Sequence, residues 1–293
     1  MRIFYVYPIP GELGWLLFNF LPHMQYQASE TFGIDYAVVH VRRGYEGLYR
    51  LGVPTDFHVF DYHGDKTEGN AFVLHAPQAY DAYKEHCAAC DVEVEQLRLN
   101  HDVVVLRLPL KEYRYHRYKM KHRLFQRLTP RQGFVEKWSD LVSSDAIIFH
   151  LRHISRSVKK NTSQSMYDAA WKWASKHGRQ FITVGATLGY RQPFTFRGVN
   201  LMDQTNLDDL IAIFHLGGLV VGSSSGPMHL ASLTQTPHIV WGGGRNDIRR
   251  RYLETWNPFN TPVDHLTTSF SFSDKSKLIN ALDAMVSRSQ VIT

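Results

Sequence analysis

The feature of this sequence that most constrains its fold is a strand, a serine-rich turn and a helix start in succession at residues 219–231. An apolar run ends in Gly222, three serines follow, and Pro227 stands where a first helical residue is expected. A proline there loses nothing by lacking an N–H group. Free backbone N–H groups, hydroxyls and the positive helix end would then face one anion, as a phosphate requires. The turn predicts an anion site; a plain turn without a ligand is the alternative that spacing alone leaves open.

Strand-length and helix-length runs alternate through the whole second half. Strands are expected at residues 146–150, 180–185, 219–222 and 238–242, and helices at residues 165–176, 207–216 and 227–233. A serine caps the first of these helices and Asn206 the second. This alternation predicts a Rossmann-like domain with a parallel sheet. A further helix, expected at residues 273–287 with Leu278, Leu282 and Met285 on one face, would pack back on the domains.

The first half has the same character but a weaker pattern. Strands are expected at residues 2–7, 36–40, 57–60 and 103–106, separated by helix-length runs at residues 16–31 and 78–87. These βαβ units predict a second, mainly parallel sheet. A chain of 293 residues suits two domains, which we place at residues 1–140 and 141–293.

Composition narrows the class of protein. Apolar residues make up 44% and charged residues 20%, as in an ordinary globular chain. No run reaches the roughly 18 apolar residues of a membrane span, and the start lacks a signal-peptide pattern. Two cysteines, Cys87 and Cys90, exclude a disulfide framework, so a cytoplasmic location is expected. The net charge of +6 favours an anionic partner without deciding which.

Residues 206–210 and 224–237 resemble the donor-binding half of glycosyltransferases of the heptosyltransferase type, glycosyltransferase family 9. Members commonly read Asp-Ser/Thr-Gly-Pro-x-His-x-Ala here, and this chain fits except that Ser224 replaces the acid. The resemblance implies an α/β fold of the GT-B kind, with two Rossmann-like domains facing across a cleft. It also implies that a nucleotide-sugar donor is bound by Ser224, Ser225, Gly226, Pro227, Met228 and His229.

The resemblance extends to a basic loop and a glycine turn. In the family, the loop after the first strand of the second domain supplies a basic side chain to the nucleotide diphosphate, and Arg152, Arg156 and Lys160 are the candidates. A cation there would offset the charge that develops on the leaving diphosphate. Gly243 follows the strand at residues 238–242, where a glycine permits close approach to a ligand. A solvated basic loop and a simple turn are the alternatives.

On the acceptor side, the resemblance points to a carboxylate. Similar transferases carry an acidic residue in a glycine-flanked turn after the first strand, and Glu12 matches it as the base that deprotonates the acceptor hydroxyl. An exposed glutamate without a role is the alternative. Arg42, Arg43 and Tyr45 end the next strand and are candidates for the acceptor side.

No metal or cofactor is expected, the nucleotide-sugar being a substrate. No Asp-x-Asp element ends a strand, and Asp208 and Asp209 stand where a helix begins. Cys87 and Cys90, with His86 beside them, suggest zinc, but a four-ligand site normally shows a second pair at matching spacing and none is evident.

The acceptor is suggested only by a basic and aromatic segment at residues 111–131, which carries eight Lys or Arg against one acid. Backbone contacts and base stacking are compatible with this pattern, as are a basic linker or a patch for lipid-linked glycans. We therefore expect a metal-independent hexosyl-, pentosyl- or heptosyltransferase that acts on a hydroxyl of a glycan or of a modified base in DNA. A nucleotide-sugar epimerase, a binding protein without turnover and a nucleic-acid-binding protein are the alternatives.

Overall fold

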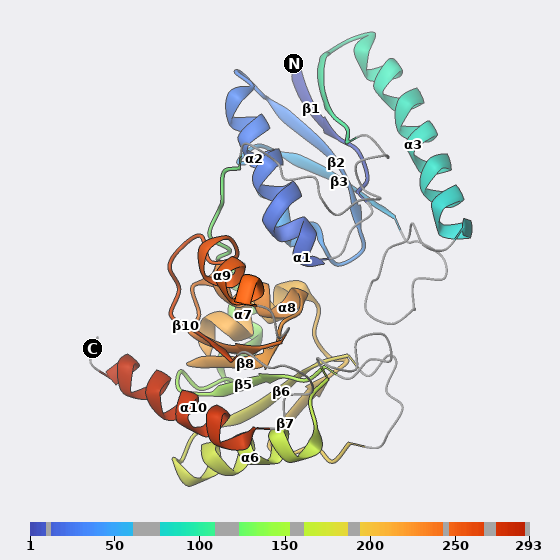
Figure 1. The fold of residues 1–293 in the computed structure, drawn as a ribbon. Coiled ribbons are helices and arrows are strands. Elements are labelled where there is room, and N and C mark those ends of the chain that lie inside the picture. The colour runs from blue at the N-terminus through green and yellow to red at the C-terminus, as the bar shows by residue number, and fades with distance from the viewer. Residues whose placement is uncertain are drawn as a thin grey trace. The chain divides into compact units, whose positions relative to one another are not determined.

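The computed structural model describes residues 1–9, 13–60, 77–108, 123–152, 161–186, 194–242, 246–266 and 274–290. The chain divides into two compact units, Met1–Gln126 and Arg127–Thr293. Each unit contains a parallel sheet with helices packed on it (Figure 1). Among the described helices, none is both long and apolar enough to cross a membrane.

The first unit has a parallel sheet in the order β3-β2-β1-β4. Its strands are β1 (Arg2–Val6), β2 (Tyr36–Arg42), β3 (Thr55–Phe60) and β4 (Asp102–Leu106). All four coincide with predicted strands, with ends shifted by one or two residues. A short 3-10 helix, η2 (Glu46–Leu48), follows β2. Helix α3 (Pro77–Arg98) extends well beyond the predicted residues 78–87 and packs Tyr83, Cys87, Cys90 and Val94 against the side chains of β1.

The helix predicted at residues 16–31 is interrupted by a π segment. It consists of α1 (Leu13–Trp15), the π segment η1 (Leu16–Phe20) and α2 (Leu21–Glu30). Pro22 has no N–H group, so it cannot donate to the carbonyl of Phe18, four residues earlier. Arg123 Nη1 donates to that carbonyl instead, at 3.1 Å, and Leu124 N donates to Pro22 O at 2.8 Å. The end of the first unit is thereby fastened to this helix.

The second unit has a parallel sheet in the order β10-β9-β8-β5-β6-β7. Its strands are β5 (Ile147–His150), β6 (Phe181–Gly185), β7 (Val199–Met202), β8 (Leu219–Ser223), β9 (His238–Trp241) and β10 (Val263–Leu266). Counted along the chain from β5, the order is 6-5-4-1-2-3, that of a dinucleotide-binding Rossmann sheet. The predicted Rossmann-like domain is confirmed, and the two edge strands β7 and β10 are additions to the prediction.

Some helices of the second unit begin at side-chain caps. They are α5 (Gln132–Ser139), α6 (Gln164–Lys176), α7 (Leu207–Leu216), α8 (Gly226–Thr234), α9 (Asn246–Glu254) and α10 (Lys275–Gln290). The Ser163 side chain accepts from the Met166 N–H group at the start of α6. Asn206 and Asp209 form a reciprocal capping box at the start of α7, which therefore has the predicted limits.

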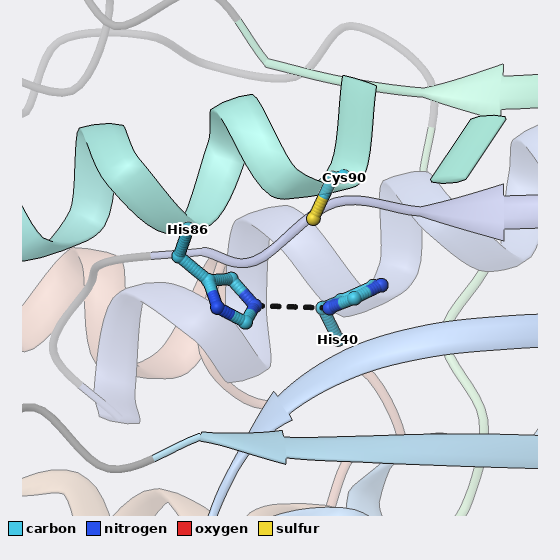
Figure 2. Close-up of side chains that lie close together, drawn as sticks. All are labelled: His40, His86 and Cys90. Carbon is cyan, nitrogen blue, oxygen red and sulfur yellow. Dashed lines mark hydrogen bonds between the residues drawn. The ribbon is translucent and has the colours of Figure 1, made fainter. Parts of the chain in front are cut away.

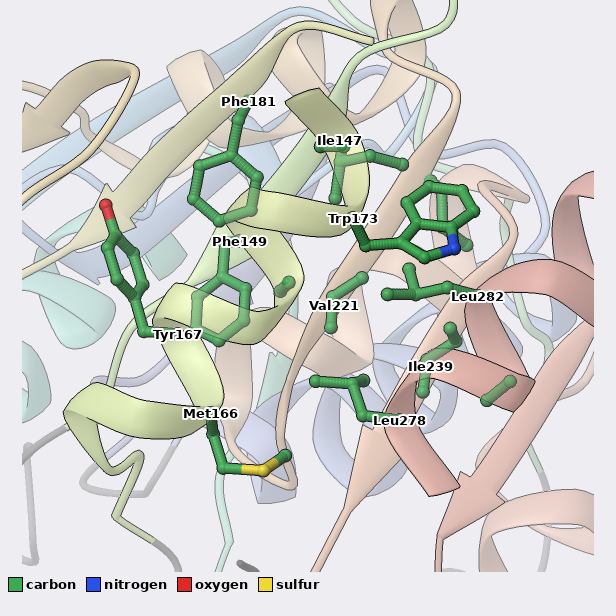
Figure 3. Packing of buried hydrophobic residues seen from close by; sticks show 14 of the residues in the cluster. Ile147, Phe149, Met166, Tyr167, Trp173, Phe181, Val221, Ile239, Leu278 and Leu282 are labelled. Carbon is green, nitrogen blue, oxygen red and sulfur yellow. The ribbon is translucent and has the colours of Figure 1, made fainter. Parts of the chain in front are cut away.

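Helices α6 and α10 close the core of the second unit on one face of its sheet (Figure 3). Phe149 and Val221 project from the sheet toward Trp173 of α6 and toward Leu278 and Leu282 of α10, and all five side chains are buried. Burying side chains of this size contributes about 1.5–3 kcal/mol each. Trp173 Nε1 also donates to Asp283 Oδ1 at 2.7 Å. The C-terminal helix thus packs back onto the sheet of its own unit.

Helix α5 is attached to the second unit by charged contacts with α7. Asp209, buried to 2% exposure, accepts from Lys137 Nζ and Trp138 Nε1, both at 2.8 Å. Arg131 pairs with the buried Asp208. Burial by itself would raise the pKa of Asp209, but the Asn206 N–H group, Lys137 and Trp138 outweigh it and hold that pKa below its usual range.

Candidate functional site

The predicted anion site lies at the carboxyl ends of β5 and β8. These strands are neighbours, and the chain runs from β5 outward in one direction and from β8 outward in the other. Ligands of open parallel sheets bind at such a switch point, beyond the carboxyl ends of the strands. The turn at residues 223–225 and the start of α8 follow β8 at this position. Sheet topology therefore supports the location that the local pattern predicted.

The start of α8 has no side-chain cap. Ser225 occupies the N-cap position, yet its hydroxyl makes no capping bond and instead lies 3.3 Å from His150 Nδ1. Ser224 N donates to Trp241 O at 2.7 Å, which fixes the turn against β9. The first turn of a helix leaves N–H groups without helical partners. Without a side-chain cap, these donors and the positive helix end are available to an anion.

A buried hydroxyl next to this turn lacks a partner. Ser223 is 0% exposed, and its Oγ has no hydrogen bond among the described residues. Thr162 lies at the end of the loop that follows β5, and its Oγ1 is also buried without a hydrogen bond among the described residues. Buried polar atoms are nearly always hydrogen-bonded, so each such atom requires an explanation. A ligand oxygen at this edge would supply the missing partner for Ser223.

His150, the last residue of β5, contributes a neutral imidazole to the site. Burial lowers its pKa to about 3, and the charge of Arg152 acts in the same direction. Its Nδ1 forms a hydrogen bond with Ser225 Oγ at 3.3 Å. The sequence placed His150 in a strand without assigning it a role, because only the pairing of β5 with β8 brings it beside the serine turn.

Gly222 permits the close approach of β8, β5 and α8. A Cβ atom at this position would lie 2.8 Å from Met228 Sδ and 3.0 Å from both the Cβ and the carbonyl oxygen of His150. Met228 is buried beneath the first turn of α8. The glycine therefore determines how near the helix start lies to His150.

His229 is held among aromatic rings. Its ring stacks on Tyr252 with centroids 5.4 Å apart and meets the edge of Trp256 at 5.1 Å. Tyr252 Oη donates to Met228 O at 3.1 Å, which links α9 to the first turn of α8. The sequence singled out His229 as a donor but missed Tyr252 and Trp256, which orient it from a later segment.

The basic loop is described at its two ends only. Arg152 is partly exposed directly after β5, and Thr162 N donates to Arg152 O at 2.9 Å, which brings the two ends together. Arg156 and Lys160 lie outside the described residues, as does Gly243.

The acceptor-side candidates gather at the carboxyl edge of the first sheet. Arg42 ends β2, and its guanidinium lies 5.1 Å from the centroid of the buried Tyr45 ring. Arg43 is exposed, and its N–H group donates to Phe60 O at 3.3 Å. Glu12 lies outside the described residues, between the end of β1 and the start of α1.

Part of the basic and aromatic segment serves the structure itself. Residues 109–122 lie outside the described part of the chain. Arg123 donates to Phe18 O and lies over the ring of Phe125, 5.5 Å from its centroid. Arg131 pairs with Asp208. Of the arginines described in this segment, these two are engaged internally, while Arg127 is exposed.

Comparisons with known proteins agree with this architecture. No protein-family model matches the chain, and no curated protein matches its sequence. Among solved structures, a glycosyl transferase family 9 protein from Veillonella parvula is 13% identical, with a TM-score of 0.61 over 98% of this chain and 97% of that one. The ADP-heptose lps heptosyltransferase II of E. coli is 15% identical, with a TM-score of 0.61 over 99% of this chain and 100% of that one. The chain therefore has the α/β fold of the GT-B glycosyltransferases, with two Rossmann-like units.

Proposed function

We propose that this protein is a glycosyltransferase that binds a nucleotide-sugar at the carboxyl edge of β5 and β8 and moves the sugar to a hydroxyl acceptor. The observation that carries the proposal is the uncapped start of α8 beside the buried, unpartnered hydroxyl of Ser223. Both features suit a diphosphate, which has several oxygens to accept hydrogen bonds and a charge that the helix end favours. The fold shared with two glycosyltransferases supports the same conclusion.

The residues at this edge suit transfer without a metal. N–H groups, hydroxyls and the neutral imidazole of His150 surround the turn, and Arg152 adds a positive charge after β5. Donors of this kind, fixed in place, stabilise the charge that develops on a departing diphosphate. Arg156 and Lys160 are proposed to add further positive charge. Ser224, in place of the family's acid, leaves the edge with one negative charge fewer.

For the acceptor half, we propose that Glu12 takes the proton of the acceptor hydroxyl and that Arg42, Arg43 and Tyr45 line the acceptor side. The acceptor is a glycan or a hydroxylated base in DNA, and the reaction takes place in the cytoplasm. Because Arg123 and Arg131 are engaged internally, a nucleic-acid acceptor rests on the basic residues of 111–121 and on Arg127.

Calorimetric titration with ADP, UDP, GDP and TDP in EDTA-containing buffer tests the donor site through Ser225→Asp. Aspartate is a good N-cap, so the variant should be at least as stable as the wild type. Its carboxylate would occupy the helix start and repel the diphosphate. At about 4 Å and an effective dielectric near 20, that repulsion is roughly 4 kcal/mol. We expect at least about a tenfold loss of affinity for the nucleotide that binds the wild type.

A matched control is Ser276→Asp, which adds the same charge to the exposed first turn of α10. It should leave nucleotide affinity unchanged. Equal affinity in wild type and Ser225→Asp would refute the donor site. Release of nucleoside diphosphate only when an acceptor is present supports transfer. Conversion of the nucleotide-sugar without such release would indicate an epimerase. Binding of the nucleotide-sugar without turnover would indicate a binding protein.

A further inference from the structure

A second group of reactive side chains lies in the first unit, between its sheet and α3. His86, Cys90 and Glu93 follow one another at spacings of four and three residues, so they lie on one face of α3. His40 on β2 and His58 on β3, which are paired in register, belong to the same group. Figure 2 shows His86 and Cys90 projecting from neighbouring turns of α3 toward His40.

Three of these residues present donor atoms to a common point. A ring nitrogen each of His40 and His86 and the sulfur of Cys90 lie within 4.8 Å of one another, and His40 Nδ1 is 2.9 Å from His86 Nε2. In a tetrahedral zinc site, bonds of about 2.0–2.1 Å to nitrogen and 2.3 Å to sulfur separate the ligand atoms by roughly 3.3–3.6 Å. The two imidazole nitrogens would therefore move apart by a few tenths of an ångström, and the sulfur would take a position about 3.6 Å from each of them, when the ion binds.

Hydrogen bonding on the far side of His40 fixes its tautomer. Tyr5 Oη donates its single proton to Glu93 Oε2 at 2.8 Å, so toward His40 Nε2, at 2.6 Å, the hydroxyl acts as acceptor. His40 Nε2 therefore carries hydrogen, and the lone pair of Nδ1 points toward His86 Nε2. Cys90 makes its own side-chain contact with Tyr5. A metal-binding histidine characteristically donates its other N–H group to a carboxylate or another acceptor. Tyr5 and Glu93 already occupy that outer position.

Burial favours the ligand form of His40. Its side chain is 4% exposed and Cys90 is 0% exposed. With hydrogen on its Nε2, the buried imidazole keeps a lone pair on Nδ1 that a metal can use. Burial raises the pKa of the Cys90 thiol, so the bound cation would have to displace its proton, as happens in structural zinc sites.

From this geometry we infer that His40 Nδ1, His86 Nε2 and Cys90 Sγ bind a zinc ion that joins β2 to α3, the hydrogen between the two imidazoles moving to His86 Nδ1 and the thiol proton being released to solvent. A nitrogen and thiolate set of this kind selects zinc over hard cations such as magnesium. The other grouping, His40 with His58 and Glu93, lacks sulfur and is more open, with His58 and Glu93 side chains 42% and 30% exposed. The sequence suggested zinc at Cys87 and Cys90 with His86 beside them, whereas the group that the fold brings together contains His40 in place of Cys87.

Cobalt substitution tests the site on the full-length protein. After removal of metal with EDTA, Co²⁺ is added and thiolate-to-cobalt charge transfer is followed in the near ultraviolet. The number of zinc ions bound per protein molecule is measured separately by elemental mass spectrometry. We expect one equivalent of zinc, a charge-transfer band in the wild type, and loss of that band in Cys90→Ser.

Cys87→Ser is the matched control, because Cys87 is also buried on α3 but lies outside the proposed ligand set. It should keep both the band and the zinc. His86→Ala should weaken zinc binding at least about 100-fold, and Glu93→Gln by about 10–100-fold as a partner of the ligand. Should Cys90→Ser fail to fold, His86→Ala decides through zinc content. The inference is overturned if the wild type binds no zinc, if His86→Ala binds it equally well, or if Cys87→Ser loses the band.

Discussion

Replacing Gly222 with alanine tests how closely the donor edge is packed. The added carbon would lie 2.8 Å from Met228 Sδ and 3.0 Å from two atoms of His150, one of them a backbone oxygen. Nonbonded carbon atoms prefer about 3.5–4.0 Å, so roughly 0.5–1 Å of movement is needed. The side chain of Met228 can turn aside, but His150 belongs to a central strand and cannot. Overpacking of this kind typically costs about 1–3 kcal/mol.

Urea denaturation and nucleotide titration measure the two consequences of Gly222→Ala. The free energy of unfolding should fall by the amount above, and nucleotide affinity should fall as well because the collision with His150 displaces β8 and the turn that leads into α8. Gly133→Ala in α5 is the control, since its Cβ would meet nothing within 4 Å. That change should be neutral or stabilise by up to about 1 kcal/mol. Wild-type stability together with wild-type affinity in Gly222→Ala would refute this account of the packing.

Three further predictions concern catalysis and stability. Glu12→Gln should lower the transfer rate about 10²–10⁴-fold while nucleotide affinity is kept, and an unchanged rate in a steady-state assay would remove Glu12 from the mechanism. Asp209→Ala loses the α7 capping box and leaves Trp138 Nε1 without its acceptor, so urea denaturation should show roughly 2–4 kcal/mol less stability; a loss under 1 kcal/mol would contradict this. Burial lowers the pKa of His150 to about 3 and of His238 to about 4, so between those values and 6.5 the unfolded chain binds more protons than the folded chain. Stability should therefore fall as the pH drops from 6.5 toward 4, by at most about 1.4 kcal/mol per pH unit for each histidine; denaturation midpoints that stay constant from pH 7 to 5 would argue against it.

Local signals accounted for the parts of the fold that are built locally. The Asn206 cap and the apolar run behind it gave α7 its limits, because a capping box involves residues only three positions apart. The buried strands β5, β6, β8 and β9 were recognisable as short apolar runs. The edge strands β7 and β10 have only four residues each and mix polar with apolar side chains, so neither showed a period. Helix α9, with the sequence NDIRRRYLE, is too polar to stand out.

The candidate sites show the same contrast between residues that are close in sequence and residues that only the fold brings together. Ser225 and His229 were predicted because their turn and helix are contiguous in sequence. Their partners were not, because His150 lies 75 residues before Ser225 and reaches it only through the pairing of β5 with β8. His40 likewise lies 46 residues before His86. A pattern read along the chain does not show which strand ends become neighbours.

The π segment before α2 makes two distant positions interdependent over evolutionary time. Pro22 cannot donate to the Phe18 carbonyl, and Arg123 donates to it from a segment more than 100 residues later. A chain that exchanged Pro22 for a residue with an N–H group could close the helix itself, and Arg123 would lose its acceptor. A chain that lost Arg123 first would lose this bond, and Pro22 could not replace it. Drift at one position is therefore expected to relax or redirect selection at the other, so among diverging relatives the two should change together.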